Sequence, residues 1–244
     1  MEPLASDALR ELEKLARELR KGDDLSQAEL DRLVAEWEPR VRPDHKDRSE
    51  IFSVASPAGE TTGVVGPRWI FHLCGLRHRA VEIAFKTQTG LIVLQQRSAT
   101  KQDWPGAVDM AVAGHLPQGN DGNDIPYEAG AWKEIEEEIG LRAEDAHVTL
   151  VEKKLTPIGE PYCSFDSDLR RNPPFLNAEV RQVFGATLTG DGLTRIHFAD
   201  GEAMGLLLVT PETAWTLLAD EPIASGMRYS LPRYLDWLEK NPGA

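Results

Sequence analysis

The stretch Trp132–Leu141 reads WKEIEEEIGL and decides how the rest of the chain is interpreted. With about 3.6 residues per turn, a helix over this stretch places its apolar side chains on one face. Gly140 follows the last apolar position and is the residue type that commonly ends a helix. The apolar face consists of Trp132, Ile135 and Ile139. The sequence therefore predicts a helix from about residue 128 to residue 139 with this face buried.

The opposite face of the predicted helix is acidic. Glu134, Glu137 and Glu138 lie there within an arc of roughly 100°. Glu134 and Glu138 are four residues apart, so their charges repel each other on a helix. Clustered carboxylate oxygens are ligands that Mg²⁺ and Mn²⁺ prefer. The pattern favours a metal site, and a solvated acidic surface is the alternative interpretation of such a string of residues.

This stretch resembles the second half of the Nudix box. The box is a glycine, five residues, a glutamate, seven residues, and then Arg-Glu-apolar-x-Glu-Glu-x-Gly-apolar. The matching positions are Glu134, Ile135, Glu137, Glu138, Gly140 and Leu141. Upstream, residues 113–119, AGHLPQG, resemble the glycine-rich strand and loop that open the box. The resemblance implies that Glu134, Glu137 and Glu138 hold Mg²⁺, with Mn²⁺ as the alternative.

Two features of the chain depart from the box. Lys133 stands where the family has arginine, which removes bidentate pairing with a carboxylate. The distance from Gly114 to Lys133 exceeds the family spacing by five residues, so Asn120–Pro126 is interpreted as an insertion. For the first glutamate of the box the sequence offers three candidates, which are Asp121, Asp124 and Glu128.

The resemblance extends over about residues 50–220. GLRHRAV (residues 75–81), QRS (96–98) and WPG (104–106) are similar to the Nudix subgroup nearest to isopentenyl diphosphate isomerase. The resemblance implies an α/β fold in which a mixed β-sheet is sandwiched between α-helices. We expect residues 1–48 to form an N-terminal helical hairpin and linker, and residues 49–244 to form the Nudix domain.

An isopentenyl diphosphate isomerase is the main alternative enzyme. The resemblance to those enzymes implies a cysteine directly before a Gly-His pair, but Ala113 precedes Gly114-His115 here. Without a thiol, proton transfer to an alkene carbon lacks one of its two partners. Glu179 resembles one isomerase metal ligand, whereas Asn177 stands where another would be. We therefore favour a hydrolase, and a binding module that has lost catalysis is the third interpretation.

The hydrolase interpretation assigns roles to individual residues. A metal held by the three glutamates would orient a water for attack on phosphorus, and Glu138 or Glu179 would take its proton. The catalytic set is Glu137, Glu138 and Lys133. The expected substrate-binding residues are Arg97, Lys101, Trp104, His115 and Glu179, with ordinary surface charge as the alternative for Arg97 and Lys101. His72 and His78 would be ligands in an isomerase-like site, but we interpret both as structural histidines.

Composition narrows the choice of partners. The 244 residues carry a net charge of −13 without any basic run, which disfavours duplex nucleic acid. Two cysteines cannot form a disulfide framework, and no apolar run is long enough to span a membrane. We expect a cytoplasmic protein that acts on a small-molecule diphosphate. The apolar stripe Leu9, Leu12, Leu15 and Leu19 predicts that the N-terminal hairpin packs on the rest of the chain or supports a homodimer.

Overall fold

The structure is a computed structural model that describes residues 3–101, 104–198, 201, 203–220 and 222–242. The chain forms two compact units. Unit 1 comprises Met1–Ala80, His115–Ile125 and Pro161–Arg181, and unit 2 comprises Val81–Gly114, Pro126–Glu160 and Gln182–Ala244. Strands β3 (Arg77–Thr87), β6 (Val112–His115) and β9 (Phe175–Leu188) contribute residues to both units. The division into residues 1–48 and 49–244 stays a prediction.

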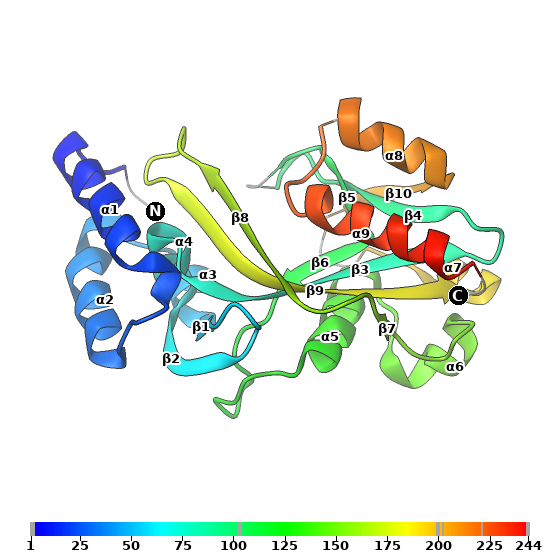
Figure 1. The fold of residues 1–244 in the computed structure, drawn as a ribbon, viewed down its shortest axis with the longest axis horizontal. Helices are drawn as coiled ribbons and strands as arrows, with labels where there is room; N and C mark the ends of the chain where they lie inside the picture. The colour runs from blue at the N-terminus through cyan, green and yellow to red at the C-terminus, as the bar shows by residue number, and fades with distance from the viewer. Residues whose placement is uncertain (1–2, 102–103, 199–200, 202, 221, 243–244) are drawn as a thin grey trace. The chain divides into compact units, whose positions relative to one another are not determined.

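Unit 1 begins with helices and continues with a hairpin, shown in blue and cyan in Figure 1. Its helical elements are α1 (Ser6–Glu18), η1 (Arg20–Gly22), α2 (Gln27–Val41), α3 (His45–Ser49) and α4 (Arg68–Cys74). Strands β1 (Ile51–Ala55) and β2 (Thr61–Pro67) pair antiparallel, and β8 (Tyr162–Asp168) pairs antiparallel with β9. Ser26 and Glu29 form the capping box of α2, because each side chain accepts a hydrogen bond from the other residue's backbone N–H.

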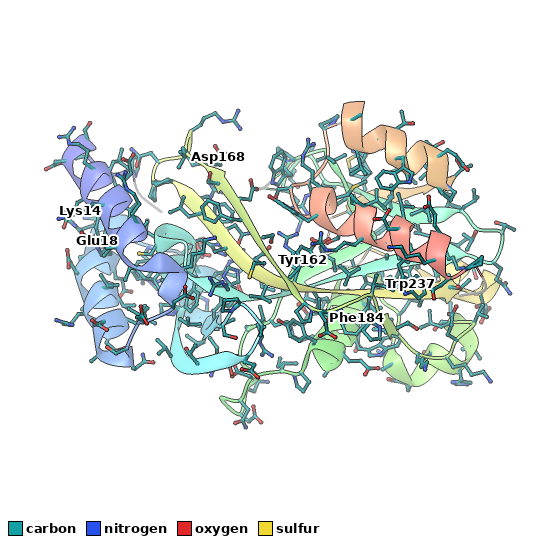
Figure 2. The ribbon with its side chains drawn as sticks, viewed as in Figure 1. Lys14, Glu18, Tyr162, Asp168, Phe184 and Trp237 are labelled. Carbon is teal, nitrogen blue, oxygen red and sulfur yellow. The ribbon has the colours of Figure 1, made fainter. Side chains whose placement is uncertain are left out.

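The N-terminal helices share one hydrophobic core with β1 and α4. Leu12 of α1 and Leu30 of α2 are fully buried, and they belong to the same cluster as Phe52 of β1 and Phe71 of α4. The apolar stripe of α1 is therefore covered within unit 1. Figure 2 labels Lys14 and Glu18 on α1, where they form an exposed ion pair at 3.6 Å.

We expect Leu12→Ala to lower the free energy of unfolding by about 2–5 kcal/mol, because it leaves a cavity in this core. Chemical denaturation measures the change. Lys14→Ala is the matched control on the same helix, since its side chain is 76% exposed and we expect no measurable effect. Equal stability of the two variants would contradict the burial of α1.

Unit 2 is built on a sheet with helices around it. Its strands are β4 (Ile92–Arg97), β5 (Val108–Met110), β7 (Thr156–Pro157), β10 (Ala203–Val209) and parts of β3, β6 and β9. The strand order is β10-β4-β3-β9-β7, with β5 beside β4 and β6 beside β3. The strands with a described register run antiparallel, and an isolated Val108–Ile223 bridge is parallel.

The helical elements of unit 2 are α5 (Tyr127–Ile139), η2 (Ala143–Asp145), α6 (Ala146–Thr149), α7 (Gly190–Arg195), α8 (Pro211–Asp220) and α9 (Met227–Lys240). In Figure 1, α5 lies on one side of the strands and α9 on the other. Tyr234 of α9 packs so closely on Gly185 of β9 that a Cβ there would lie 3.0 Å from its ring. The predicted fold class, an α/β fold with a mixed sheet between helices, is confirmed. None of the described helices is long and apolar enough to cross a membrane.

Candidate functional site

Helix α5 divides its glutamates between the interior and the surface of the protein. The helix ends at Gly140, whose φ of 71° is the left-handed conformation that glycine adopts without strain. Ile135 and Ile139 are buried as predicted, but Trp132 is only half-buried, and Glu138 is buried beside them. Glu138 is 8% exposed, whereas the Glu137 side chain is 55% exposed. The acidic face predicted from the sequence is therefore divided between the interior and the surface.

Glu138 is held from the sheet. Gln95 of β4 is 3% exposed, and its side-chain amide donates a hydrogen bond to Glu138 Oε2 at 3.3 Å. A neutral donor satisfies a buried carboxylate without cancelling its charge. Sequence reasoning missed Gln95, and the signal available was a polar residue directly after the apolar run of a strand, LIVLQ.

Glu134 lies against the backbone of Gly114, which lies in β6 and is the first glycine of AGHLPQG. A Cβ built on Gly114 would lie 2.0 Å from Glu134 Oε2 and 2.3 Å from its Cδ. The Glu134 carboxylate thus occupies the space that a side chain at position 114 would fill. The glycine-rich segment and the acidic helix, which the sequence suggested as two parts of one box, meet at this contact.

Lys133 pairs with the carboxylates on its own helix. Its Nζ donates to Glu137 Oε2 at 3.0 Å and lies 3.8 Å from Glu134 Oε1. A lysine supplies single charge-assisted bonds where arginine would supply a planar fork. Of the three candidates for the first glutamate of the box, Glu128 lies in the first turn of α5. Asp121 closes the loop by accepting from Asn123, and Asp124 accepts from Ser53 Oγ at 2.5 Å in unit 1.

Unit 1 contains a second group of potential ligands. His72 of α4, His78 of β3 and His115 of β6 place one ring nitrogen each within 4.8 Å of the others. Among the described residues, these are the three side chains whose ligand atoms converge in this way. Phe52 stacks on His78 with ring centroids 4.7 Å apart, and Phe175 stacks on His72 at 4.5 Å. We call these three residues the histidine cluster.

Glu179 of β9 borders the histidine cluster. Its Oε1 lies 2.9 Å from His115 Nε2 and 3.9 Å from His78 Nε2. Burial raises the pKa of the Glu179 carboxyl, but Arg181 and the hydrogen bond from His115 outweigh burial and hold the pKa well below its usual range. Glu179 is therefore ionised and a poor proton acceptor. The structure brings His115 and Glu179 together, and their role in substrate binding stays a prediction.

The two buried histidines of the cluster are neutral. Burial, followed by the neighbouring His78 and His115, lowers the pKa of His72 well below its usual value. Burial lowers the pKa of His78 to about 3. Neither ring nitrogen of His72 has a hydrogen-bond partner among the described residues, whereas His78 Nδ1 donates to the Leu76 carbonyl at 3.0 Å. An unsatisfied buried imidazole calls for an explanation beyond packing.

The remaining predicted substrate residues lie around the end of β4. Arg97 Nη1 donates to Asp109 Oδ2 at 2.8 Å, and its side chain is 12% exposed. This contact engages Arg97 with β5 and leaves its role in binding phosphate a proposal. Lys101 and Trp104 lie in the connection from β4 to β5, where Trp104 is 41% exposed and has a positive φ of 52°.

Comparisons with known proteins support the fold. No protein-family profile matches the chain. The chain is 39% identical over 94 residues to Nudix hydrolase 3 of Arabidopsis thaliana, a match that covers 38% of this chain and 12% of that protein. It therefore spans only a small part of that relative's length. The solved structure of DR0079 from Deinococcus radiodurans matches 75% of this chain and 98% of its own, with a TM-score of 0.51 and 18% identity.

The chain shares its fold with DR0079, and over 94 residues its sequence is similar to that of Nudix hydrolase 3. The assignment of Trp132–Leu141 to the second half of a Nudix box stays a prediction. The similarity to the subgroup near isopentenyl diphosphate isomerase stays a prediction. A structure of E. coli dihydroneopterin triphosphate pyrophosphohydrolase is also similar, with a TM-score of 0.45 and 14% identity over 64% of this chain and 94% of its own.

Proposed function

We propose that the protein is a Mg²⁺-dependent Nudix hydrolase that cleaves a diphosphate linkage in a nucleoside diphosphate-linked or related small molecule. The observation that carries this proposal is the fixed placement of two helix carboxylates. Gly114 leaves the space in which the Glu134 carboxylate lies, and Gln95 holds the buried Glu138. A surface helix that is merely acidic needs neither contact.

The carboxylates of α5 have the ligand type that suits a hard divalent cation, although among the described residues the structure does not bring their oxygens together as it does the ring nitrogens of the histidine cluster. Glu134, Glu137 and Glu138 supply only carboxylate oxygens, which Mg²⁺ prefers and Mn²⁺ also accepts. Lys133 balances one of the three negative charges, so the helix keeps an excess of negative charge for a cation. The net charge of −13 also favours a small substrate that arrives with a cation over a nucleic-acid duplex.

The chain's own residues would prepare the reaction around that cation. When bound, Mg²⁺ supplies Lewis-acid polarisation of a phosphate oxygen and a lowered pKa of water. Gln95 fixes the orientation of Glu138, and Glu138 takes the proton of the attacking water. Lys133 holds Glu137 in place through its hydrogen bond. Glu179 is the weaker candidate for the base, because its pKa is held low by Arg181.

The proposal is tested by incubating the protein with a panel of diphosphate compounds and Mg²⁺. We expect phosphate or nucleotide release from one compound class, with activity abolished by EDTA and restored by Mg²⁺. Glu137→Gln, which removes a charged ligand but little volume, is expected to reduce that release strongly. Absence of cleavage across the panel, or full activity in EDTA, would refute the metal-dependent hydrolase.

The histidine cluster favours one second candidate, an isomerase-like activity. Three imidazoles beside Glu179 resemble the ligands of an isomerase metal site. Ala113 still lacks the thiol that isomerisation would use. Isopentenyl diphosphate therefore belongs in the panel. A change of double-bond position without phosphate release would support the isomerase, whereas phosphate release would support the hydrolase.

A further inference from the structure

The histidine cluster has the ligand types of a transition-metal site. Three imidazoles and a carboxylate suit cations such as Zn²⁺, Fe²⁺ or Co²⁺. Neither ring nitrogen of His72 has a hydrogen-bond partner among the described residues, so each has a lone pair or a proton to offer. Ligand type is one requirement of a buried metal site, and the balance of charge is another.

Glu179 already has a cationic partner on its second oxygen. Its Oε1 faces His115 and His78, while its Oε2 is contacted by Arg181 Nη2. Glu179 and Arg181 are two residues apart on β9, so both side chains point to the same face of the strand. Their side chains are 4% and 6% exposed. A guanidinium stays charged in proteins, so the charge of this carboxylate is balanced without a metal.

The other arginines of unit 1 near this core have their own acidic partners. Arg68 contacts Asp47 and Glu50, Arg77 contacts Asp23, and Arg79 lies 3.8 Å from Asp124. Each of these carboxylates already has a cationic partner, including Glu50, whose charge also acts on His115. The Glu179–Arg181 pair is already balanced, so a divalent cation held by Glu179 and the three imidazoles would add positive charge to a buried site. Such charge is costly to bury.

We propose that Arg181 takes the place of a metal ion at the histidine cluster. The guanidinium holds Glu179, Glu179 orients His115, and the group is a metal-free polar network in the native protein. Removing the charge of Arg181 should convert the same ligands into a transition-metal site. The inference stands independently of the helix glutamates, which lie in unit 2 and do not enter the argument. It also bears on the isomerase candidate, which needs a metal at these histidines.

The decisive variant is Arg181→Gln, which removes the charge and keeps a hydrogen-bonding side chain. Co²⁺ is the probe, because its visible absorption reports nitrogen ligands directly. We expect Co²⁺ to bind the variant at least about 10-fold more tightly than the unaltered protein, a change typical of altered outer contacts at metal sites. The metal-free variant should melt at a lower temperature, because Glu179 loses its buried partner, and Zn²⁺ should restore its melting temperature.

Two further variants make the result specific. Arg181→Lys keeps the charge and is expected to bind Co²⁺ as weakly as the unaltered protein. Adding His115→Ala to Arg181→Gln should abolish the gain, which would place the bound ion at the cluster. The measured quantity is the Co²⁺ absorption that is lost when His115 is replaced. Ions bound at the helix glutamates do not contribute to this difference.

Two results would overturn the proposal. One is tight, His115-dependent binding of Co²⁺ by the unaltered protein, equal to that of Arg181→Gln. The other is a folded Arg181→Gln variant that gains no binding. If Arg181→Gln does not fold, the test compares Co²⁺ absorption of the unaltered protein with that of His115→Ala. Co²⁺ absorption lost on removing His115 contradicts the inference, and spectra that are the same in both support it.

Discussion

Replacing Glu138 by glutamine is expected to lower kcat/KM for the cleaved diphosphate by about 10²–10⁴-fold. Glutamine has nearly the same shape, and its side-chain oxygen can still accept the hydrogen bond that Gln95 donates to Glu138. The substitution therefore removes a negative charge and a proton acceptor while it preserves packing around a residue that is 8% exposed. The measurement is steady-state kinetics on the compound that the panel identifies, with Mg²⁺ in excess.

Glu136→Gln is the matched control for this prediction. Glu136 lies on the same helix, its side chain is 55% exposed, and it pairs at 3.1 Å with Arg142. We expect less than a twofold change in kcat/KM, since exposed ion pairs contribute little. Both variants should melt near the temperature of the unaltered protein. If Glu136→Gln lost as much activity as Glu138→Gln, the loss would come from the lower total negative charge of α5. The specific role assigned to Glu138 would then be wrong.

Local signals in the sequence predicted the parts of the fold that depend on neighbouring residues. The helix expected at about residues 128–139 is found at Tyr127–Ile139, and it ends at Gly140 as expected. Hydrophobic spacing and a terminal glycine are properties of the segment itself, so no distant contact is needed to recognise them. RAVEIAFK (residues 79–86) and LIVLQQR (91–97) likewise predict a hairpin around TQTG (87–90), and the hairpin is present between β3 and β4.

One local prediction was wrong. Residues 147–155, HVTLVEKKL, begin with apolar and β-branched residues and predict a strand. The structure instead has α6 at Ala146–Thr149. Thr149 Oγ1 donates to the Asp145 carbonyl, and His147 Nδ1 donates to the Glu144 carbonyl, so side chains satisfy the backbone of a helical turn. Side-chain bonding of this kind competes with strand pairing and is not visible in the apolar pattern.

The site depends on contacts that sequence spacing does not reveal. The helical wheel places Glu134, Glu137 and Glu138 on one arc, but it cannot show that Gln95 of β4 reaches one of them. Arg97 appeared available for phosphate, yet the register that pairs Gln95 with Asp109 brings Asp109 within reach of its guanidinium. Strand register is set by the tertiary fold, so these partners could be identified only in three dimensions.

The histidine cluster shows the same limit more strongly. His72, His78 and His115 come from a helix and two strands, and no fixed interval connects them. Sequence reasoning could compare each histidine with a related enzyme, but it could not determine whether the rings converge. Arg181 was not considered at all, because a single arginine in a strand has no local signature. Its importance comes from the carboxylate two residues earlier and from the burial of both side chains.

Gly114→Ala is expected to reduce kcat/KM by about 10²-fold with little loss of stability, because misplacing a catalytic group by about 1 Å can cost that much. The new methyl group would lie 2.0 Å from Glu134 Oε2 and 2.8 Å from Glu134 Cγ, so the Glu134 side chain must move. This side chain is flexible, so it can move without disturbing the core. Gly205→Ala in β10 is the control, since a Cβ there meets nothing within 4 Å.

A double-mutant cycle separates this explanation from a general distortion of the strand. If Gly114→Ala acts only by displacing Glu134, it should cost nothing further in a Glu134→Ala background, where the side chain that it would strike is gone. The two losses would then be strongly non-additive, as expected for residues in direct contact. Additive losses would mean that the methyl group damages β6 by another route. In that case the contact between Gly114 and Glu134 could no longer serve as the evidence that this helix was built to position a ligand.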